Sequence, residues 1–469
     1  MKYWLFKSEP DSWSWEQQKA KGEAGFAQSP VGTGPDRLVD WGTASGTANL
    51  EAEGSLTTSC TAAPPALDDQ AYAFTAPFRA PQGSPIRELF KYVGRPGMIS
   101  FAGGYPSKDL FDRDGIARAL EAAYRSDPIA CLQYGDTAGA PALRASLAQL
   151  MMARGVHCSA DDVIVTTGSQ QGFDLLLRTL IAPGDTALIE EPAYPAAIQA
   201  LRLAGANIVP VRTDADGIDV EALAAQLDAL PEANRPKLLY TVPTFANPTG
   251  ATLPRERREA LIALAAARRI VLVEDDPYGE LRFSGTAVPP MIALADAYPG
   301  ARDWIVYFGS LSKIVAPGLR IGWTIAPAPI ARRMIVAKQT SDLCTAPLSQ
   351  ETARYYLDSG SLALHLRSIV GAYRSRCEAL LNALAHFSPH EIAFSAPQGG
   401  MFVWARLTGG RDAAEVLKRA IEQNVMFVPG AAFFVRTPDA SSLRLSFAAP
   451  SEAEAFEGAR RLALALAQA

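Results

Sequence analysis

A lysine lies among hydroxyls and glycines in the segment 310–323, whose sequence is SLSKIVAPGLRIGW. Lys313 follows an apolar run typical of a buried strand and lies between hydroxyl side chains and a Gly-rich turn. Ser310, Ser312 and Arg320 complete the string. A lysine amine can form an imine with a carbonyl compound, and hydroxyls with an arginine can hold a phosphate. A single lysine is most often a solvated surface charge, so the whole string carries the interpretation.

The string resembles the lysine motif of the class I and II aminotransferases, enzymes of fold type I that depend on pyridoxal 5′-phosphate (PLP). The similarity covers about residues 75–469. Within the family the chain looks most like the aminoadipate, kynurenine and aromatic aminotransferases. FAGGYP (101–106), LQYGDTAG (132–139) and EDDPYGEL (274–281) occur in the order that this subgroup has. The resemblance implies that Lys313 carries PLP as a Schiff base.

Donors for the phosphate of PLP are expected at the start of a helix. Gly168, Ser169 and Gln170 follow a predicted strand, and backbone N–H groups at a helix N-terminus bind anions. Alone, this sequence could be an ordinary helix cap. Beside the lysine string, we expect Ser169 and Gln170 to share the phosphate with the two serines and the arginine of that string.

A carboxylate near the pyridine nitrogen would keep the ring of PLP protonated and electron-poor. Asp275 ends the apolar run IVLVED and matches the aspartate of the family, with Glu274 and Asp276 on either side. A charge at a buried strand end is costly without a partner, and the cofactor would be that partner. The alternative is that all three carboxylates are solvated in a loop.

The resemblance implies three further contacts with the ring. Asn247 in NPTG and Tyr278 in DPY match positions that hydrogen-bond the ring oxygen, and Tyr194 in EPAYP matches the residue that stacks on the ring. We count Tyr278 among the catalytic residues, together with Lys313 and Asp275. NPTG alone is a good turn sequence, and Tyr194 could be a core residue.

Residues for the substrate follow from the same resemblance. Arg444 lies on a predicted strand among apolar residues, where an arginine is costly unless paired and where a carboxylate suits its forked donors. The family has its substrate arginine here; a structural ion pair is the alternative. Asn247, Gly104, Tyr105 and Arg87 match other substrate-binding positions. Arg87 could instead be a surface charge on a helix.

Tyr134 matches a tyrosine that, in the family, reaches the phosphate held by the neighbouring subunit. We therefore expect a homodimer with shared active sites. The implied reaction is a ping-pong transfer of an amino group from an amino acid to a 2-oxo acid, with 2-oxoglutarate the expected acceptor. The donor stays open between acidic and aromatic amino acids.

Two other functions remain open at this point. One is a PLP lyase or decarboxylase that uses the same lysine, because fold and cofactor do not decide the reaction. The other is a transcription regulator with an aminotransferase-like domain. The first 75 residues argue against a regulator, since they lack the paired amphipathic helices and basic face of a DNA-binding domain.

The elements that must position these residues alternate along the chain from Tyr72 onward. Apolar runs predict strands at 162–168, 186–192, 207–211, 237–243, 270–277 and 304–310. Amphipathic segments predict helices at 171–182, 193–204, 219–230, 255–269 and 326–341. This alternation is typical of an α/β fold with a mostly parallel sheet, whose functional groups lie at strand ends. The resemblance to fold type I implies seven strands in that sheet.

We expect four parts in the chain. A flexible extension (1–75) precedes a segment that packs with the small domain (76–120), a large PLP-binding domain (121–365) and a small α+β domain (366–469). The last part contains predicted strands at 401–407 and 442–448 and helices at 362–386, 412–423 and 451–467. Residues 1–25 resemble the first strand of EVE domains, which bind modified bases. We interpret them as a remnant, since one strand cannot form that fold.

Composition excludes several classes of protein. The net charge of −5 and the pI of about 5.6 give no indication of a nucleic-acid partner. Five scattered cysteines without CxxC and four histidines without HExxH argue against a disulfide framework or a metal site. No apolar run reaches the roughly 18 residues of a membrane span. We expect a cytoplasmic enzyme with no membrane partner.

Overall fold

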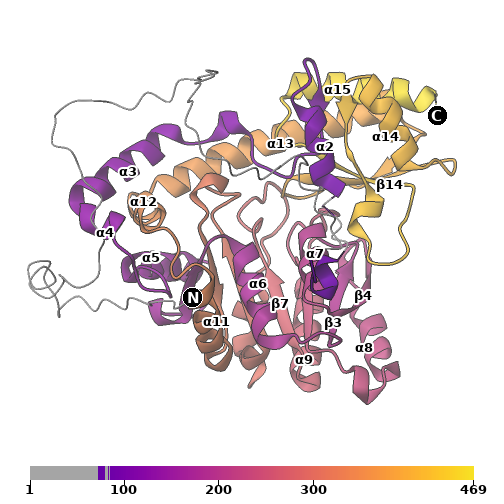
Figure 1. Cartoon of the computed structure of the whole chain (residues 1–469). Helices are drawn as coiled ribbons and strands as arrows, with labels where there is room; N and C mark the ends of the chain where they lie inside the picture. Colours follow the sequence, from indigo (N-terminus) through magenta and orange to yellow (C-terminus); the bar gives the residue numbers. More distant parts are fainter. Residues whose placement is uncertain (1–71, 80–82, 84, 469) are drawn as a thin grey trace, which may run out of the picture. The chain divides into compact units, whose positions relative to one another are not determined.

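The computed structural model describes residues 72–79, 83 and 85–468 (Figure 1). The expectations for residues 1–71, which include the EVE-like start and most of the extension, lie outside the described residues. The chain divides into Met1–Ala71 and a compact unit, Tyr72–Ala469. Everything below concerns the second unit.

An eight-stranded sheet forms the centre of this unit, in the order β2-β9-β8-β7-β6-β3-β4-β5. Its strands are β2 (Val163–Thr166), β3 (Thr186–Glu191), β4 (Asn207–Asp214), β5 (Gly217–Ile218), β6 (Leu238–Thr241), β7 (Val271–Asp275), β8 (Ile305–Ser310) and β9 (Gly322–Ile325). The five strands from β8 to β4 run parallel, and β9 runs antiparallel to both of its neighbours. The sheet exceeds the expected seven strands because the two residues of β5 pair with the end of β4.

Helices cover the sheet and explain why its strands are continuous apolar runs. The covering helices are α6 (Ser169–Leu180), α7 (Pro195–Leu203), α8 (Val220–Ala229), α9 (Arg255–Arg268), α10 (Met291–Leu294) and α11 (Ala328–Ser341). α6 packs with α7 and α11, whereas α9 packs with α8 and α10, and Figure 1 shows α6 in front of the strands. Every residue of β6, β7 and β8 is buried. The strands and helices of the central sheet begin and end within three residues of the predicted ranges, except β5, β9 and α10, which were not predicted separately.

The C-terminal part builds a second sheet of four antiparallel strands, in the order β10-β11-β14-β13. Its elements are α13 (Ser361–Phe387), β10 (Ile392–Phe394), β11 (Phe402–Leu407), α14 (Ala413–Glu422), β12 (Val425–Met426), β13 (Val428–Pro429), β14 (Ser442–Ser446) and α15 (Glu452–Ala467). β1 (Ile99–Ser100) pairs with β12. This pairing supports our proposal that segment 76–120 belongs with the small domain (366–469).

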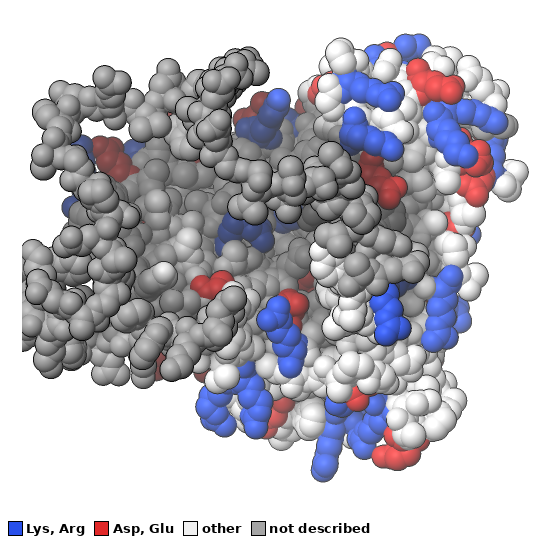
Figure 2. Space-filling view, viewed as in Figure 1, with Lys and Arg blue, Asp and Glu red and all other residues white. Residues whose placement is uncertain are grey.

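The remaining α-helices of this unit precede the first strand of the central sheet or follow its last strand in sequence. They are α2 (Pro85–Val93), α3 (Arg113–Ser126), α4 (Pro128–Leu132), α5 (Pro141–Met152) and α12 (Pro347–Asp358). None of the helices in the described ranges has both the length and the apolar character that crossing a bilayer requires. On the described part of the face in Figure 2, Lys and Arg side chains are interspersed with Asp and Glu.

Candidate active site

Lys313 lies in the turn that follows β8, at the carboxyl edge of the parallel strands. Its Nζ donates a hydrogen bond of 2.8 Å to the carbonyl oxygen of Gly104. Burial lowers the pKa of Lys313 to about 8, and Arg444 and Arg320 lower it further while Asp275 opposes them. The lowered pKa therefore leaves more of this amine unprotonated near neutral pH than in an ordinary lysine, and the unprotonated form is the one that attacks a carbonyl carbon.

Asp275 ends β7, the strand beside β8, and is only 7% exposed. Tyr240 Oη donates a hydrogen bond of 2.5 Å to its Oδ2, whereas Oδ1 is buried without a partner among the described residues. Burial raises the pKa of Asp275 to about 7, although the hydrogen bond from Tyr240 lowers it. A buried carboxylate oxygen without a partner is costly, and a protonated ring nitrogen would satisfy it.

The alternative that these three carboxylates are solvated is wrong, because Glu274, Asp275 and Asp276 are all buried. Both oxygens of Glu274 accept backbone N–H bonds, from Met291 and Ile292. Asp276 forms an ion pair of 2.6 Å with Arg154. Both oxygens of Glu274 are thus occupied and Asp276 has a cationic partner, although its Oδ1, like that of Asp275, is buried without a hydrogen bond among the described residues. Within the described chain, Asp275 is the one of the three carboxylates that has no cation paired with it and no backbone N–H bond.

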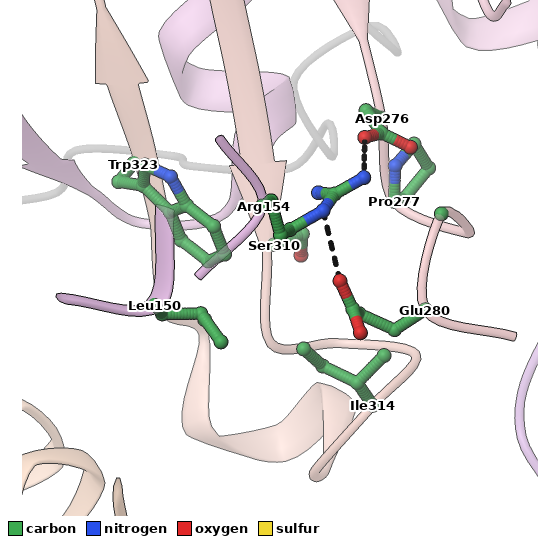
Figure 3. A pocket seen from close by; sticks show the side chains of 9 residues that line it. Leu150, Arg154, Asp276, Pro277, Glu280, Ser310, Ile314 and Trp323 are labelled. Carbon is green, nitrogen blue, oxygen red and sulfur yellow. Dashed lines mark hydrogen bonds and ion pairs between the residues drawn. The ribbon is translucent and has the colours of Figure 1, made fainter. Parts of the chain in front are cut away.

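Arg154 holds the turn after β7 in place. Its guanidinium bonds Asp276, Glu280 at 2.8 Å and the hydroxyl of Tyr307 at 2.8 Å. Figure 3 shows this arginine between the two carboxylates, with Ser310 beside it. Since Tyr278 lies between the two carboxylates in sequence, Arg154 fixes the segment that presents Tyr278.

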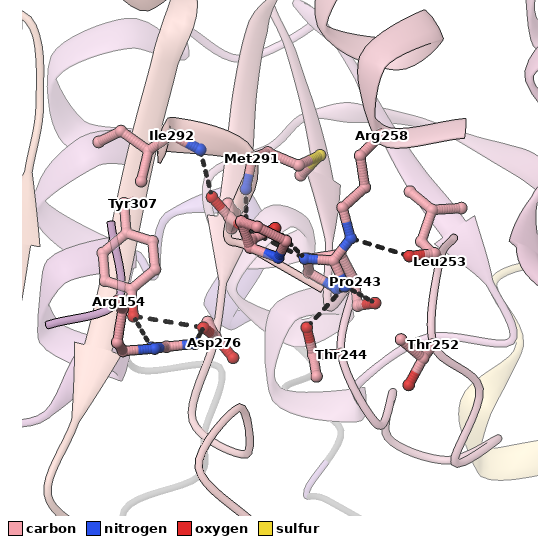
Figure 4. A network of polar contacts seen from close by, with 12 residues as sticks. Arg154, Pro243, Thr244, Thr252, Leu253, Arg258, Asp276, Met291, Ile292 and Tyr307 are labelled. Carbon is pink, nitrogen blue, oxygen red and sulfur yellow. Dashed lines mark hydrogen bonds and ion pairs between the residues drawn. The ribbon is translucent and has the colours of Figure 1, made fainter. Parts of the chain in front are cut away.

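Arg258 fixes the other segment that faces the site, as Figure 4 shows. This side chain is fully buried on α9 and donates to the carbonyl oxygens of Leu253, Pro243 and Pro289 at 2.8–3.0 Å. It also donates to Thr244 Oγ1 at 2.8 Å. These bonds clamp both ends of the loop that contains NPTG. In the sequence, RERREAL resembles an exposed charged face, so no periodicity singled out Arg258.

Asn247, Tyr278 and Tyr194 gather near the same strand ends. Asn247 and Tyr278 are buried, and Tyr194 begins α7. Burial raises the pKa of Tyr278 strongly and Tyr194 raises it further, while a hydrogen bond with Asn247 opposes this. Tyr194 also raises the pKa of Tyr240 and of Arg444, so it lies among the groups of the site.

Arg444 on β14 is 2% exposed, and no ion pair joins it to a carboxylate of the described chain. Its Nη1 donates to Asn247 Oδ1 at 2.8 Å and its Nη2 to the carbonyl oxygen of Ala102 at 2.7 Å, but its Nε has no partner there. The rings of Phe402 and Phe433 lie 4.3 and 5.0 Å from its Cζ. Burial lowers its pKa to about 10, so it stays charged at neutral pH. A structural ion pair within the described chain is excluded, and a ligand carboxylate suits this buried cation.

Gly104 lies between the lysine and the arginine. Its carbonyl oxygen accepts from Lys313, and a Cβ placed on it would lie 3.8 Å from both terminal nitrogens of Arg444. Tyr105, the next residue, is partly exposed, and burial raises the pKa of its hydroxyl. Arg87 lies in α2, but its side chain is outside the described part of the structure.

Three strand ends bring the expected phosphate donors together. Ser310 at the end of β8 pairs with Gly322 at the start of β9, and Gly322 pairs with Thr166 at the end of β2. α6 begins next, at Ser169, without a side-chain cap. A Cβ on Gly322 would lie 2.5 Å from the backbone nitrogen of Ser169, so only glycine lets β9 approach the start of α6 so closely. We name Ser169, Gln170, Ser310, Ser312 and Arg320 the phosphate cup.

Arg320 closes one side of the phosphate cup. Its Nη2 donates to the carbonyl oxygen of Thr167 at 3.0 Å and lies 2.6 Å from the position of a Cβ on Gly168. Ser312 N donates to Ser310 Oγ at 3.1 Å. Uncapped N–H groups, hydroxyls and a guanidinium form a site for an anion.

Two expected phosphate ligands are more exposed. The side chain of Gln170 is exposed, although its backbone lies in the first turn of α6. Tyr134 follows α4 and is 77% exposed. The Tyr134 side chain lies on the surface of this subunit, as expected if it binds the phosphate held by a second subunit.

The residues present fit PLP. A carboxylate oxygen without a partner, an uncapped helix N-terminus and a buried arginine without a carboxylate match a ring nitrogen, a phosphate and a substrate carboxylate. Lys313 lies in their midst. Within the described ranges, no group of three or more His, Cys, Asp or Glu side chains has the arrangement to hold a metal ion.

Comparisons with known proteins agree with this geometry. The sequence model described as aminotransferase class I and II matches residues 104–462. The chain is 39% identical to aromatic-amino-acid aminotransferase 1 of Thermococcus litoralis, over 85% of this chain and 95% of that one. It is 38% identical to 2-aminoadipate transaminase of Thermus thermophilus, over 82% and 94%. The crystal structure of a kynurenine aminotransferase of Pyrococcus horikoshii matches with a TM-score of 0.81, at 37% identity, over 86% of this chain and 98% of that one.

Tyr240 was missed by the sequence analysis, and it yields a test of the role of Asp275. Tyr240→Phe removes a hydrogen bond that stabilises the ionised carboxylate, so the pKa of Asp275 should rise. We expect the acidic limb of the pH–rate profile for amino-acid conversion to move to higher pH by about 1 unit, because such a bond contributes roughly 1.5 kcal/mol or more.

Tyr307→Phe is the matched control, since it removes a buried hydroxyl that bonds Arg154 and Asp276 but not Asp275. It should leave the acidic limb in place. An unchanged limb in Tyr240→Phe would mean that Asp275 does not set it.

Proposed function

The chain belongs to the class I and II aminotransferases, PLP-dependent enzymes of fold type I, and from this premise we propose which of its residues perform the transfer. The catalytic residues are Lys313, Asp275 and Tyr278. One observation carries the proposal: the amine of Lys313 and the guanidinium of Arg444 bond the same short segment, at the carbonyl oxygens of Gly104 and Ala102. An amino-acid substrate needs two groups close to each other. One is a lysine that gives up its link to the cofactor to the amine of the substrate, and the other is a cation that binds the carboxylate of the substrate.

We assign the cofactor contacts by the part of PLP that each residue would hold. Asp275 would face the ring nitrogen, Asn247 and Tyr278 the ring oxygen, and Tyr194 the ring face. The phosphate cup would hold the phosphate through Ser169, Gln170, Ser310, Ser312 and Arg320, with Tyr134 from a second subunit. When bound, PLP withdraws electrons from Cα of the amino acid and so makes the Cα proton acidic.

The protein would then supply binding and proton transfer. Arg444 and Asn247 orient the α-carboxylate, which fixes the Cα–H bond relative to Lys313. Lys313 Nζ would take the proton from Cα as a base and release it again as an acid at the cofactor. Its pKa of about 8 suits both steps near neutral pH.

For substrates, we propose an aromatic amino acid, kynurenine or 2-aminoadipate as donor and 2-oxoglutarate as acceptor. The names of the similar proteins support this choice. Gly104, Tyr105 and Arg87 would line the side-chain pocket. Tyr105 favours aromatic donors by ring contact, and Arg87 favours acidic ones by charge.

We further propose that the enzyme is a cytoplasmic homodimer. The four described cysteines are free, which suits a reducing compartment. Ile129 and Leu132 on α4 are 75% and 70% exposed, and Tyr134 follows them. Large apolar side chains that are exposed three residues apart on one helix indicate an interface, and a second copy would cover them.

The donors can be ranked in single half-reactions. Purified protein with PLP is mixed with glutamate, 2-aminoadipate, kynurenine, phenylalanine, leucine or alanine, one at a time. We expect 2-aminoadipate, kynurenine and phenylalanine to convert the bound cofactor to its pyridoxamine form at least tenfold faster than alanine. Absorption spectra follow the conversion. Bound cofactor that no amino acid converts would contradict transamination and favour a lyase or decarboxylase.

Negative charges introduced on α4 test the proposed dimer. Ile129→Asp with Leu132→Asp should yield monomers in light scattering, and the dissociation constant for PLP should rise at least tenfold because Tyr134 no longer reaches a second site. Leu464→Asp, on the exposed side of α15, is the control and should stay dimeric. A doubly substituted protein that remains dimeric with unchanged PLP affinity would refute the interface on α4.

A further inference from the structure

A cluster of polar side chains lies behind the phosphate cup, where α11 packs against α6. Lys338 in the last turn of α11 is fully buried. Its Nζ donates to both oxygens of Asp342, at 2.7 and 2.9 Å, to Thr345 Oγ1 at 3.1 Å and to Gln171 Oε1 at 3.3 Å. We name Lys338, Asp342, Thr345, Gln171 and Thr167 the α11–α6 network.

The network ends on Thr167, the residue that precedes the turn into α6. Thr167 Oγ1 donates to Asp342 Oδ2 at 3.0 Å, and Thr167 N donates to Gln171 Oε1 at 2.7 Å. Gln171 Nε2 donates in turn to the same Asp342 oxygen at 2.7 Å. The carbonyl oxygen of Thr167 accepts from Arg320. Every polar atom of Thr167 is therefore held, and the backbone direction into Gly168 and Ser169 is fixed.

Gly168 has φ of 82°, a left-handed conformation that leads directly into the first turn of α6. Glycine adopts this region freely, so Gly168 alone does not fix the direction of the N–H groups that follow. The bonds to Thr167 supply that constraint from one side. The close approach of Gly322 supplies it from the other.

Charge gives the network a second role. Burial raises the pKa of Asp342, but the hydrogen bonds from Lys338 and Gln171 outweigh burial, and the pKa lies below its ordinary value. Asp342 is thus an anion bonded to two residues at the start of α6. Lys338 neutralises it, so a phosphate dianion meets the helix terminus and Arg320 without an uncompensated negative charge behind them.

We propose that Lys338 and Asp342 are positioning residues for the phosphate end of the cofactor. They act through Thr167 and Gln171 and do not touch the cofactor themselves. This inference rests on the proposed function, because it takes the start of α6 as the phosphate site. It assigns a purpose to a buried lysine that the reaction does not use.

The test compares PLP with pyridoxal, which lacks the phosphate, in fluorescence titrations of the apoprotein. Lys338→Met removes the charge and keeps much of the side-chain volume. We expect its dissociation constant for PLP to rise at least tenfold and that for pyridoxal to change less than twofold. Lys338→Arg, which keeps the charge, should recover part of the PLP affinity.

Lys237→Met is the matched control. Lys237 forms an ion pair of 2.5 Å with Asp185 at the amino ends of β6 and β3, the edge of the sheet opposite the site. Its substitution should leave both dissociation constants within twofold. Should Lys338→Met fail to fold, Thr167→Val removes only the hydroxyl bonded to Asp342 and should raise the PLP dissociation constant at least threefold.

Two results would overturn the inference. One is equal weakening of PLP and pyridoxal by Lys338→Met, as a general structural role would give. The other is an unchanged PLP affinity in Lys338→Met or, in its place, in Thr167→Val. Failure of the wild-type protein to bind PLP would instead overturn the proposed function, so the two failures are distinguishable.

Discussion

The guanidinium of Arg444 is buried, and no ion pair joins it to a carboxylate of the described chain. Desolvating a cation costs several kcal/mol when it lacks a counter-ion, so the burial of Arg444 destabilises the folded protein. Two neutral oxygens and two aromatic rings offset part of the cost. The remainder is available to a ligand that brings its own carboxylate. The same reasoning applies to Asp275, whose buried Oδ1 lacks a partner until a cation arrives.

The topology explains why these groups meet. Parallel strands end at one edge of a sheet, so Asp275 on β7 and the lysine turn after β8 are neighbours. Arg444 comes from the second sheet, on a strand whose Ser446 N donates to the carbonyl oxygen of Phe101. That bond brings the segment with Gly104 between the two sheets. The site is therefore built from three distant parts of the chain: the ends of β7 and β8, the segment with Gly104, and β14 with Arg444.

Much of this was accessible from the sequence because local signals and motifs agreed. The strands are apolar runs. Asp275 and the lysine string lie at strand ends, and Arg444 lies within an apolar strand. Tyr240, Arg258 and Lys338 were not accessible, for a common physical reason. The main partners of Tyr240 and Arg258 lie in other parts of the chain, whereas Lys338 pairs with Asp342 four residues on but is buried where α11 packs against α6. Within its own element each resembles a core tyrosine or an exposed charge. Their roles depend on tertiary contacts that no local period encodes. The short strand β5 was not predicted for another reason, since two residues are too few to form a pattern.

The central claim is that Lys313 forms the covalent link to the cofactor. The most direct measurement is to reduce the PLP-loaded protein with borohydride, digest it and locate the pyridoxyl group by peptide mass spectrometry. We expect the label on Lys313 and none on Lys338 or Lys237. A label on another lysine, or none at all in protein that still transaminates, would contradict this claim.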